Sequence, residues 1–202
     1  MAKTKGVAKD VVTGKREAIL RAATKVFARN GYFNSKVSDI ASAAGIADGT
    51  VYLYFKSKDE ILHSIFDRAM AEFIADGKTE IAGLDNAAAK LGRIAELHLE
   101  RLGSDRDMAI VFQVELRGST KFMQEFSASG FREYLDIICA TIKEGQAAGN
   151  FRDDIKPVVA AKIFYGSLDE MVTNWVLSSK SYPLVPMAGE VLKIFFGGVL
   201  KK

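Results

Sequence analysis

The sequence is poor in the residues that cross-link or interrupt a chain. Its 202 residues include one cysteine, three prolines and one tryptophan, while 49% are hydrophobic and 26% are charged. With Cys139 as the sole thiol, no disulfide can form within one chain, which suits a reducing, cytoplasmic compartment. A chain of this length buries roughly 70% of the surface that it exposes when unfolded, so it can build a core without cross-links.

Long apolar runs are absent as well. The longest stretches without a charged residue are nine residues long, at 171–179 and 181–189. A membrane-spanning helix needs roughly 20 predominantly apolar residues. The basic residues near the N-terminus are not followed by the apolar segment that a secretory signal contains. We therefore expect no membrane partner and a cytoplasmic location.

Motifs for catalysis and metal binding are also missing. The sequence has no glycine-rich phosphate loop, no nucleophile motif and no paired histidine and carboxylate. His63 and His98 have no second ligand at metal spacing, so we expect both at the surface or half-buried. Cys139 lies in an apolar run and is expected to pack in the core rather than to act as a redox switch. The sequence thus predicts no enzyme, no metal site and no cofactor.

Charge is unevenly distributed along the chain. The net charge is +3, but residues 1–60 carry 11 Lys or Arg against 6 Asp or Glu, whereas residues 61–202 carry 17 against 19. This asymmetry of +5 and −2 suggests a small anion-facing head on a near-neutral body. A solvated basic tail would produce the same imbalance, so charge alone leaves both interpretations open.

Hydrophobic periodicity predicts helices along nearly the whole chain. From Lys15, apolar residues recur at the i, i+3, i+4 and i+7 spacing of one helical face. Gly31 and Gly45 favour helix ends, and Ser57 with Glu60 has the form of a capping box that starts the next helix. Further helices are expected at about 86–102, 106–117, 120–148, 156–178 and 185–200. Since no alternating β-branched run competes, the predicted fold is all-α.

Residues 31–60 predict a helix-turn-helix. Two short helices, separated by a turn with glycine, follow a longer supporting helix. The residues expected to pack inward are Ile40, Ala41, Ala44, Ile46, Val51 and Phe55. This leaves Thr50, Tyr52 and Tyr54 facing out, close to Lys58. Hydroxyl and ammonium groups in such an arrangement suit the phosphate oxygens and base edges of DNA.

The chemistry of duplex DNA suggests a role for each exposed position. Tyr52, Tyr54 and Lys58 are suited to phosphate, and so is Lys36 near the start of the preceding helix. Glycine lets the backbone approach the duplex, threonine can contact a base edge or a thymine methyl, and aspartate can accept from cytosine. The positions expected to read sequence are Asp48, Gly49, Thr50 and Leu53.

These motifs together resemble the TetR-type transcriptional regulators. The resemblance rests on Phe27-x-x-x-Gly31-Tyr32, Val37-Ser38-Asp39-Ile40-Ala41, Ala44-Gly45-Ile46, Gly49-Thr50-Val51-Tyr52-x-Tyr54-Phe55 and Lys58-x-x-Ile61-Leu62. It implies that the first three helices bind operator DNA and that the remaining helices form a body for ligand binding and dimerisation. The DNA-binding residues that it implies, with those above, are Lys36, Ser38, Ala47, Asp48, Gly49, Thr50, Tyr52, Leu53, Tyr54 and Lys58.

Two positions depart from the pattern that this resemblance implies. Many members carry Ser or Thr as the cap of the second helix, where this chain has Lys36. Either Ser35 caps the helix instead, or Lys36 replaces the cap with a phosphate contact. Ala47 stands in place of the usual Ser or Thr after the turn, so a hydroxyl contact is lost there.

A narrower resemblance concerns the body. Residues 109–117 and 166–175, with the turn at 47–49, are similar to the acyl-CoA-responsive repressors of fatty-acid degradation within the same family. This implies that a long-chain fatty acyl-CoA, a small apolar effector, occupies the body and releases the DNA. The candidate ligand-binding residues are Phe112, Leu116, Arg117, Tyr165, Leu168 and Trp175. Aromatic residues at this spacing are also typical of plain core, and Arg117 either meets phosphates of coenzyme A or pairs with Glu115 or another surface acid.

The predicted organisation has three parts. Residues 1–14 form a basic flexible arm, residues 15–60 the DNA-binding domain, and residues 61–202 the ligand-binding and dimerisation domain. The residues expected at a homodimer interface are Phe164, Met171, Trp175, Leu192, Phe195 and Phe196, followed by Gly197 and Gly198. Such a dimer would read a pseudo-palindromic operator with its recognition helices about 34 to 36 Å apart. The alternatives are a regulator with another apolar ligand, a binding protein without DNA regulation, and an all-α enzyme using the same cavity.

Overall fold

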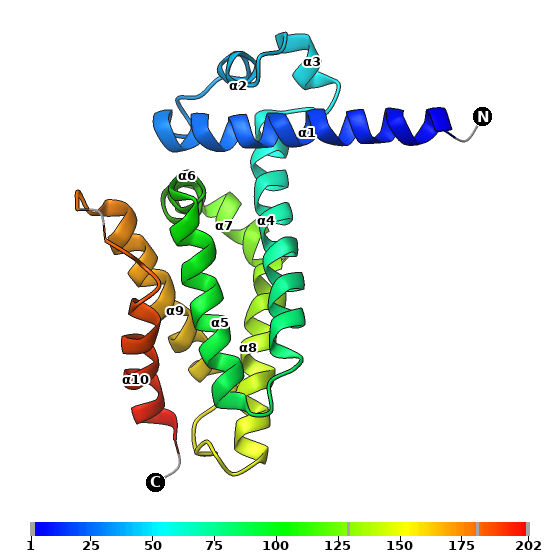
Figure 1. Ribbon diagram of the computed structural model, residues 1–202. Coiled ribbons are helices and arrows are strands. Elements are labelled where there is room, and N and C mark those ends of the chain that lie inside the picture. The colour runs from blue at the N-terminus through cyan, green and yellow to red at the C-terminus, as the bar shows by residue number, and fades with distance from the viewer. Residues whose placement is uncertain (1–2, 129, 181, 201–202) are drawn as a thin grey trace.

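The computed structural model describes residues 3–128, 130–180 and 182–200, and most of these residues are helical (Figure 1). In chain order the helices are α1 (Lys3–Asn30), α2 (Val37–Ala44), α3 (Asp48–Tyr52), α4 (Lys58–Ile81), α5 (Ala87–Ser104), α6 (Arg106–Ile110), the π-helix η1 (Val111–Glu115), the 3-10 helix η2 (Leu116–Gly118), α7 (Thr120–Ala128), α8 (Gly130–Ala147), α9 (Pro157–Leu177) and α10 (Met187–Val199). Within the described ranges the sole β contact is an antiparallel bridge between Phe151 and Leu200. The predicted all-α fold is confirmed.

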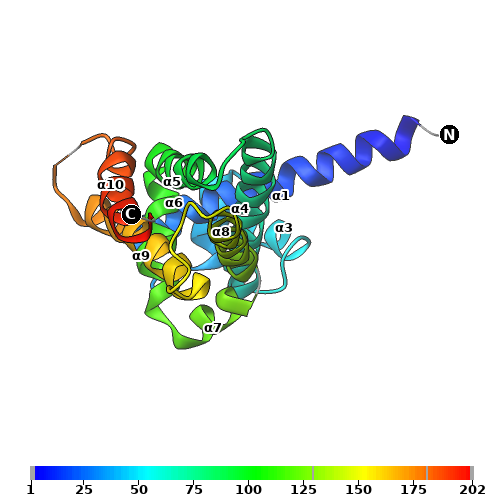
Figure 2. The same ribbon diagram turned by 90° about the horizontal axis from the view of Figure 1, so that it is seen from below.

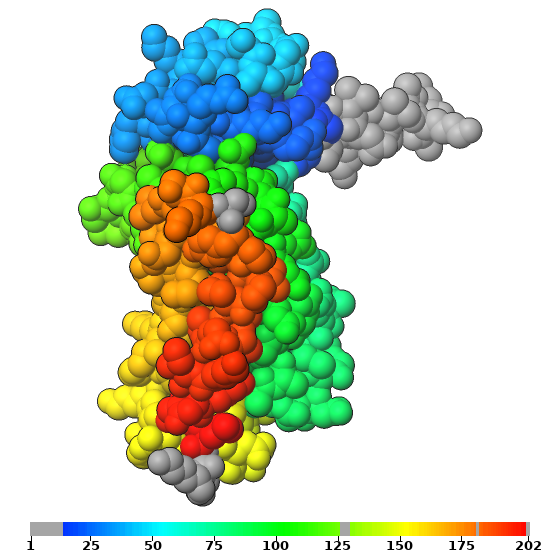
Figure 3. All heavy atoms as spheres, turned by 60° about the vertical axis from the view of Figure 1, so that its left-hand side comes forward, coloured from blue at the N-terminus to red at the C-terminus, as the bar shows by residue number. Residues whose placement is uncertain are grey.

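The molecule has two parts, which we call the head and the body. The head consists of α1 with α2 and α3 on its outer side, and the body is the bundle beneath it (Figure 1). Helix α4 starts in the head and descends through the body, while α6 lies directly under α1. In the space-filling view the atoms of the head cover one end of the body (Figure 3). Helix α4 is therefore the element that both parts share.

Helix α1 is longer than the periodicity predicted. Its backbone is helical from Lys3, and its first turns project beyond the rest of the molecule in both ribbon views (Figures 1 and 2). Residues 3–14 of the arm predicted at 1–14 are helical, while residues 1–2 lie outside the described part. This segment has no proline, and each of its glycines costs a helix only about 1 kcal/mol, so the helix can extend outward from its packed portion.

The core of the head follows the predicted pattern. Ile40, Ala41, Val51 and Phe55 are buried, and they pack with apolar residues of α1. Ala44 and Ile46 are half-buried but still contact this core. The short helix α2 thus owes its position to packing against α1, and α3 to packing against α2, rather than to their own length.

Helix α4 begins with a modified capping box. The Ser57 hydroxyl accepts a hydrogen bond from the Glu60 amide at 3.1 Å, as the sequence predicted. The Glu60 carboxylate, however, accepts from the amide of Lys56 at 2.6 Å instead of from that of Ser57. Both bonds satisfy free N–H groups at the entrance of the helix.

Two predicted helices of the body are divided in the structure. The helix expected at 120–148 consists of α7 and α8, and Ser129 between them lies outside the described residues. A Cβ atom on Gly130 would lie 2.8 Å from that of Met70, so α8 begins where α4 leaves room only for glycine. The helix expected at 106–117 changes type, with α6 passing into the π-helix η1 and then into η2.

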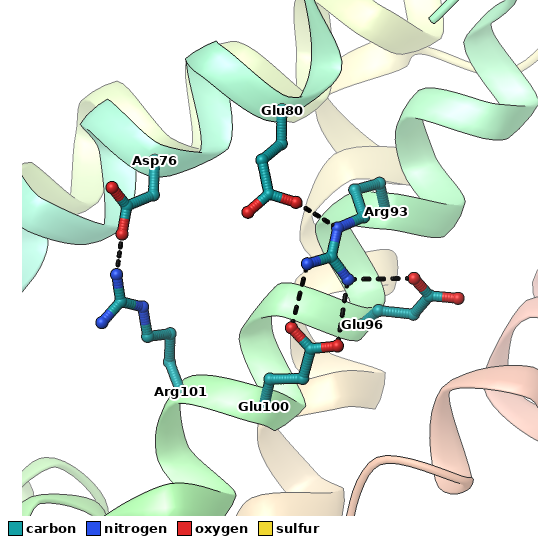
Figure 4. Close-up of polar contacts among 6 residues, drawn as sticks. All are labelled: Asp76, Glu80, Arg93, Glu96, Glu100 and Arg101. Carbon is teal, nitrogen blue, oxygen red and sulfur yellow. Dashed lines mark hydrogen bonds and ion pairs between the residues drawn. The ribbon is translucent and has the colours of Figure 1, made fainter.

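Charged side chains join α4 to α5 beside the body core (Figure 4). The six residues of this cluster are Asp76, Glu80, Arg93, Glu96, Glu100 and Arg101. Both terminal nitrogens of Arg93 contact Glu100 at 3.0 Å, and its Nε contacts Glu80 of α4. These carboxylates raise the pKa of Arg93, the Glu100 hydrogen bonds contributing most. Arg101 pairs with Asp76 in the same way, so two arginines of α5 hold it against α4.

The end of α9 is fixed by Trp175. Its indole N–H donates to the carbonyl of Tyr182 at 3.0 Å, and the guanidinium of Arg106 lies 4.8 Å from its ring centre. These contacts attach the connection between α9 and α10 to the start of α6. No helix in the described part of the chain has both the length and the apolar character needed to cross a bilayer.

Candidate functional sites

The predicted DNA-contacting residues lie on α2, α3 and the segments that border them. These helices are on the side of α1 that faces away from the body (Figure 1). The exposed members are Lys36, Ser38, Ala47, Asp48, Gly49, Tyr52 and Leu53, and the half-buried members are Thr50, Tyr54 and Lys58. Leu53 is 81% exposed and Tyr52 is 56% exposed, so two large side chains stand in solvent at the end of α3.

The turn between α2 and α3 depends on Gly45. This residue adopts φ +68°, a left-handed conformation that glycine reaches without steric cost, and its N–H donates to carbonyls at the end of α2. Ile46 then donates to the carbonyl of Ala41 at 3.0 Å, which closes the turn. Ala47 precedes α3 without a side-chain hydrogen bond to the helix start, as expected from its missing hydroxyl.

The start of α2 settles how this helix is capped. The Asp39 carboxylate accepts a hydrogen bond from the Lys36 amide at 2.8 Å. Ser35 is buried and donates to the carbonyl of Gly31 at 2.7 Å. The alternative in which Ser35 caps α2 is therefore wrong, because its hydroxyl is used within the preceding turn.

Lys58 has a structural role that the sequence did not predict. Its ammonium group donates to the carbonyls of Tyr32 and Ser35 at 2.7 and 2.8 Å and lies 4.4 Å from the centre of the Tyr32 ring. Two of its three N–H donors are thus engaged in the connection between α1 and α2. The third donor remains for a phosphate, so Lys58 joins the fold of the head to its candidate DNA surface.

Tyr32 connects the head to the body. Its amide donates to Glu115 of η1 at 2.6 Å, and its hydroxyl donates to Asp59 of α4. The hydrogen bond from Tyr32 lowers the pKa of Asp59, and Lys121 of α7 lowers it further. Burial, together with Asp59, raises the pKa of Tyr32, so this phenol stays protonated as a donor. Residues from η1, α4 and α7 therefore meet at one turn of the head.

A second junction joins α1 directly to α4. Arg68 pairs with Glu17 of α1 and lies 3.8 Å from Glu72 on its own helix. Nearer the head, Arg16 donates to the Ser64 hydroxyl at 2.9 Å. These contacts hold α4 against the underside of α1.

The body contains a cavity of about 390 Å³. Its walls come from α4, α5, α6, η1, η2, α7, α8 and α9, and the lining residues are Arg68, Ala69, Met70, Glu72, Phe73, His98, Arg101, Leu102, Ser104, Asp105, Met108, Phe112, Gln113, Leu116, Arg117, Met123, Phe131, Tyr134, Tyr165 and Asp169. Eleven of these twenty residues are apolar or tyrosine, and the other nine are polar or charged. The volume is typical of a small-molecule site.

Four of the six predicted ligand-binding residues line this cavity, namely Phe112, Leu116, Arg117 and Tyr165. Leu168 and Trp175 are not among its lining residues. Leu168 is fully buried in the core, and the indole of Trp175 is held at the far end of α9. Tyr165 and Asp169 are four residues apart and form the stripe of α9 that faces the cavity. Leu168 lies about 100° around the helix from Asp169.

A polar network forms one wall of the cavity. Asp169 is buried and accepts hydrogen bonds from Gln113, at 2.7 Å, and from Arg117. Thr173 donates to the amide oxygen of Gln113 at 2.9 Å. The acid that pairs with Arg117 is thus Asp169 rather than Glu115, and no sequence pattern connected these residues because they lie on different helices.

His98 belongs to the same wall, although the sequence predicted it at the surface or half-buried. It is buried, and its Nδ1 lies 3.2 Å from the hydroxyl of Tyr134. Burial lowers the pKa of His98 to about 4 and raises that of Tyr134 well above its ordinary value, so both are uncharged at neutral pH. The helical spacing of Leu91, Ile94 and His98 was the signal for burial, since all three lie on one face of α5.

The outer face of α9 and α10 is apolar. Ile163 is 57% exposed and Ile194 is 80% exposed, and both line a groove of about 430 Å³ between the two helices. Of the residues predicted at a dimer interface, Phe164 and Trp175 are buried in the core of the single subunit.

The remaining predicted interface residues have mixed positions. Met171 and Phe195 line the groove, while Leu192 and Phe196 are half-buried on α10. Gly197 and Gly198 have no other described atom within 4 Å of a hypothetical Cβ, so they too lie on open helix surface.

Two family models match adjoining parts of the chain, which together span residues 19–198. Residues 19–65 match the family described as bacterial regulatory proteins, tetR family, and residues 66–198 match the C-terminal region of YsiA-like proteins. The chain is 37% identical over 184 residues to a fatty acid metabolism regulator protein of Bacillus subtilis (strain 168), covering 91% of this chain and 95% of that protein.

Two solved structures share the fold closely. The fatty acid degradation regulator FadR of Bacillus halodurans has a TM-score of 0.87 and 34% identity, covering 91% of this chain and 95% of that chain. The regulator FadR of Bacillus subtilis, solved in complex with stearoyl-CoA, has a TM-score of 0.86 and 37% identity, covering 90% of this chain and 98% of that chain.

Proposed function

The chain belongs to the tetR family of bacterial regulatory proteins, and on this premise we propose that it is a homodimeric repressor released from DNA by a long-chain fatty acyl-CoA. The observation that carries this proposal is a cavity of about 390 Å³ whose lining includes residues of α6 and η1, in a body whose helix α6 lies under the helix-turn-helix head (Figure 1). A site for a small ligand next to a DNA-binding head suits a regulator that senses its effector. Residues 15–60 would bind DNA, and residues 61–202 would bind the effector and dimerise.

The lining of the cavity supports an acyl chain as ligand. Met70, Phe73, Met108 and Phe112 supply apolar surface, and flexible methionine side chains adapt readily to a long chain. Arg117 lines the same cavity and its side chain is 41% exposed, which suits an anionic head group at the edge of the site. The relative solved with stearoyl-CoA supports the same ligand class.

The positions of the head residues support separate roles in contacting phosphates and bases. Lys36, Tyr52, Tyr54 and Lys58 would contact phosphates and fix the register, with Ser38 beside them at the start of α2. Residues 47–50 and Leu53 would approach the bases. Gly49 is helical, and no other described atom lies within 4 Å of a hypothetical Cβ there. Since packing within the protein does not require this glycine, close approach to the duplex is a sufficient reason for it.

The apolar face of α9 and α10 supports a homodimer. Exposed Ile163 and Ile194 beside a groove form a surface that a second copy would cover with its own identical face, as in a two-fold interface. Such a dimer would place two recognition helices about one DNA turn apart on a pseudo-palindromic operator.

The DNA-binding part is tested by salt titration with DNA from the region upstream of the encoding gene. Several phosphate contacts predict a steep, linear fall in the logarithm of the binding constant as the logarithm of salt concentration rises. Absence of any binding without ligand would contradict the repressor function. Mass spectrometry of the purified protein, followed by addition of C12 to C18 acyl-CoAs to the DNA complex, tests the effector. Release by another apolar ligand alone would replace the acyl-CoA proposal and keep the repressor.

A further inference from the structure

We infer that Glu115 is a positioning residue for the DNA surface, because it holds the backbone of Tyr32, which in turn holds Lys58. This inference rests on the proposed function and adds to it the contact through which the cavity wall reaches the head. Glu115 touches neither the cavity nor the candidate DNA surface. Its effect on DNA binding would therefore pass through Tyr32.

The first step is the position of Glu115 on the π-helix η1. Its neighbours Phe112, Gln113 and Leu116 line the cavity, whereas the carboxylate of Glu115 lies at the turn that follows α1. A Cβ atom on Gly31 would be only 3.7 Å from this carboxylate. The π-helix η1 therefore lines the cavity with Phe112 and Gln113 and contacts the head with Glu115.

The second step is that Tyr32 is held from both sides of its backbone. Its N–H donates to Glu115 at 2.6 Å, and its carbonyl accepts from Lys58 at 2.7 Å. The side chain of Tyr32 is 3% exposed and its hydroxyl is bonded to Asp59. Since the residue is fixed at every polar atom, a displacement of Glu115 would be transmitted to the carbonyl that orients Lys58.

The third step is the helix type of η1. The amide of Leu116 bonds to the carbonyl of Val111, five residues back, and single π turns are one-residue insertions that frequently lie at functional sites. A shift of such a turn by one residue rotates the side chains by about 100°. A ligand that displaces Phe112 or Leu116 in this way would carry Glu115 away from Tyr32.

The test is a double-mutant cycle on DNA affinity in the full-length protein without ligand. Glu115→Ala removes the acceptor of a charge-assisted hydrogen bond, so we expect DNA binding to weaken by about 10-fold or more. Glu115→Gln keeps an oxygen acceptor and should stay within about 3-fold of the wild type. Equal losses in the two variants would contradict the hydrogen-bonding role.

Lys58→Met completes the cycle, because it removes the ammonium group and retains an unbranched apolar side chain. If Glu115 acts through Lys58, the alanine substitution should cost less than about 3-fold in the Lys58→Met protein. Glu17→Ala is the matched control, since it removes another contact between head and body that does not involve Tyr32. Glu17→Ala should weaken DNA binding by the same factor in the wild type and in the Lys58→Met protein. If Glu115→Ala also weakens DNA binding by the same factor in both proteins, the inference is overturned.

A second experiment, in which stearoyl-CoA is added, distinguishes a failure of this inference from a failure of the effector proposal. If stearoyl-CoA weakens DNA binding by the wild type, the ratio of DNA dissociation constants with and without stearoyl-CoA should be several-fold smaller in Glu115→Ala. An unchanged ratio would contradict transmission through Glu115. If the wild type does not respond to stearoyl-CoA, the effector proposal fails, while the cycle measured without ligand still decides the role of Glu115. Matching circular dichroism and thermal unfolding establish that each variant is folded.

Discussion

At the scale of single residues, buried polar side chains distinguish the cavity from an ordinary apolar core. His98, Tyr134, Gln113 and Asp169 are all nearly inaccessible to solvent. Burying such groups is unfavourable unless they are hydrogen-bonded. Gln113 and Asp169 bond to each other, Asp169 also bonds to Arg117, and Tyr134 lies within hydrogen-bond distance of His98 Nδ1, whereas the buried Nε2 of His98 has no partner among the described residues. The wall that they form gives the cavity a defined polar side on which a ligand can be oriented.

Removal of the imidazole of His98 should abolish part of the pH dependence of stability. The folded pKa of about 4 lies below the ordinary value of 6.5, so only the unfolded chain takes up the proton as pH falls. The contribution of neutral His98 is therefore complete above pH 6.5 and decreases toward pH 4, by about 3 kcal/mol in total. Urea unfolding from pH 7 to 4.5 should show a smaller loss of stability in His98→Phe than in the wild type.

Tyr134→Phe is the control for this prediction. It removes the hydrogen-bond partner of His98 but leaves its burial, which is the largest cause of the lowered pKa. The pH dependence should therefore persist in Tyr134→Phe. If the stability of His98→Phe falls with pH as much as that of the wild type, the proposed titration of His98 is contradicted.

Lys36 and Thr50 should have different effects on DNA recognition. Lys36→Ala removes a proposed phosphate contact, so binding should weaken by a similar factor for every DNA sequence and the salt dependence should become less steep. Thr50→Ala should mainly reduce the preference for operator over other DNA, because it removes a proposed base contact. Binding constants for operator and scrambled DNA at several salt concentrations measure both. The same effect of both substitutions on every sequence would contradict these roles.

At the scale of helices, the sequence predicted the helix ends that neighbouring residues determine. It missed features that depend on contacts with other helices. The glycines after α1 and α2 and the cap at Ser57 marked helix ends, because these signals depend only on neighbouring residues. The need for glycine at position 130 depends on Met70 of another helix. The π-helix and the extension of α1 also gave no periodic signal, since apolar spacing does not report the hydrogen-bond register.

Gly145 should be irreplaceable in α8. A Cβ atom there would lie 2.3 Å from the ring of Phe151, which is 1% exposed. Gly145→Ala must therefore displace a fully buried ring, and we expect it to destabilise the protein by about 1–3 kcal/mol. Urea unfolding at neutral pH measures this loss.

Gly92 in α5 provides the matched control. It is also helical, but no other described atom lies within 4 Å of a hypothetical Cβ there. Gly92→Ala should stabilise the protein by about 0.5–1 kcal/mol, because alanine is the better helix former. Equal effects at the two glycines would contradict the packing of α8 against Phe151.

At the scale of the whole molecule, the cavity and the candidate DNA surface lie on opposite sides of α1 and are joined at two places. The sequence predicted the helix-turn-helix fold and its packed residues, such as Ile40 and Val51, because that motif is contiguous. It identified four cavity residues through the resemblance of the body, but not Gln113, His98, Tyr134 or Asp169. A cavity built from eight helical segments is set by tertiary packing, which no local pattern specifies.

Charge on the outer face of α9 and α10 should prevent dimerisation. Ile163→Glu combined with Ile194→Glu would bury two carboxylates per subunit without partners in the proposed interface. Sedimentation should show a monomer for this variant and a dimer for the wild type. Leu177→Glu, at the end of α9 and 72% exposed, is the control outside the groove and should remain dimeric. A wild-type monomer, or a dimer in the double variant, would contradict this interface.

The most direct test of the account is the dissociation constant for operator DNA at one fixed salt concentration, with and without saturating stearoyl-CoA. Calorimetry on the same protein establishes that the acyl-CoA is bound. We expect stearoyl-CoA to raise the dissociation constant by about 5- to 150-fold, the usual range for coupling between two sites. An unchanged dissociation constant with stearoyl-CoA bound would contradict the claim that the cavity controls DNA binding.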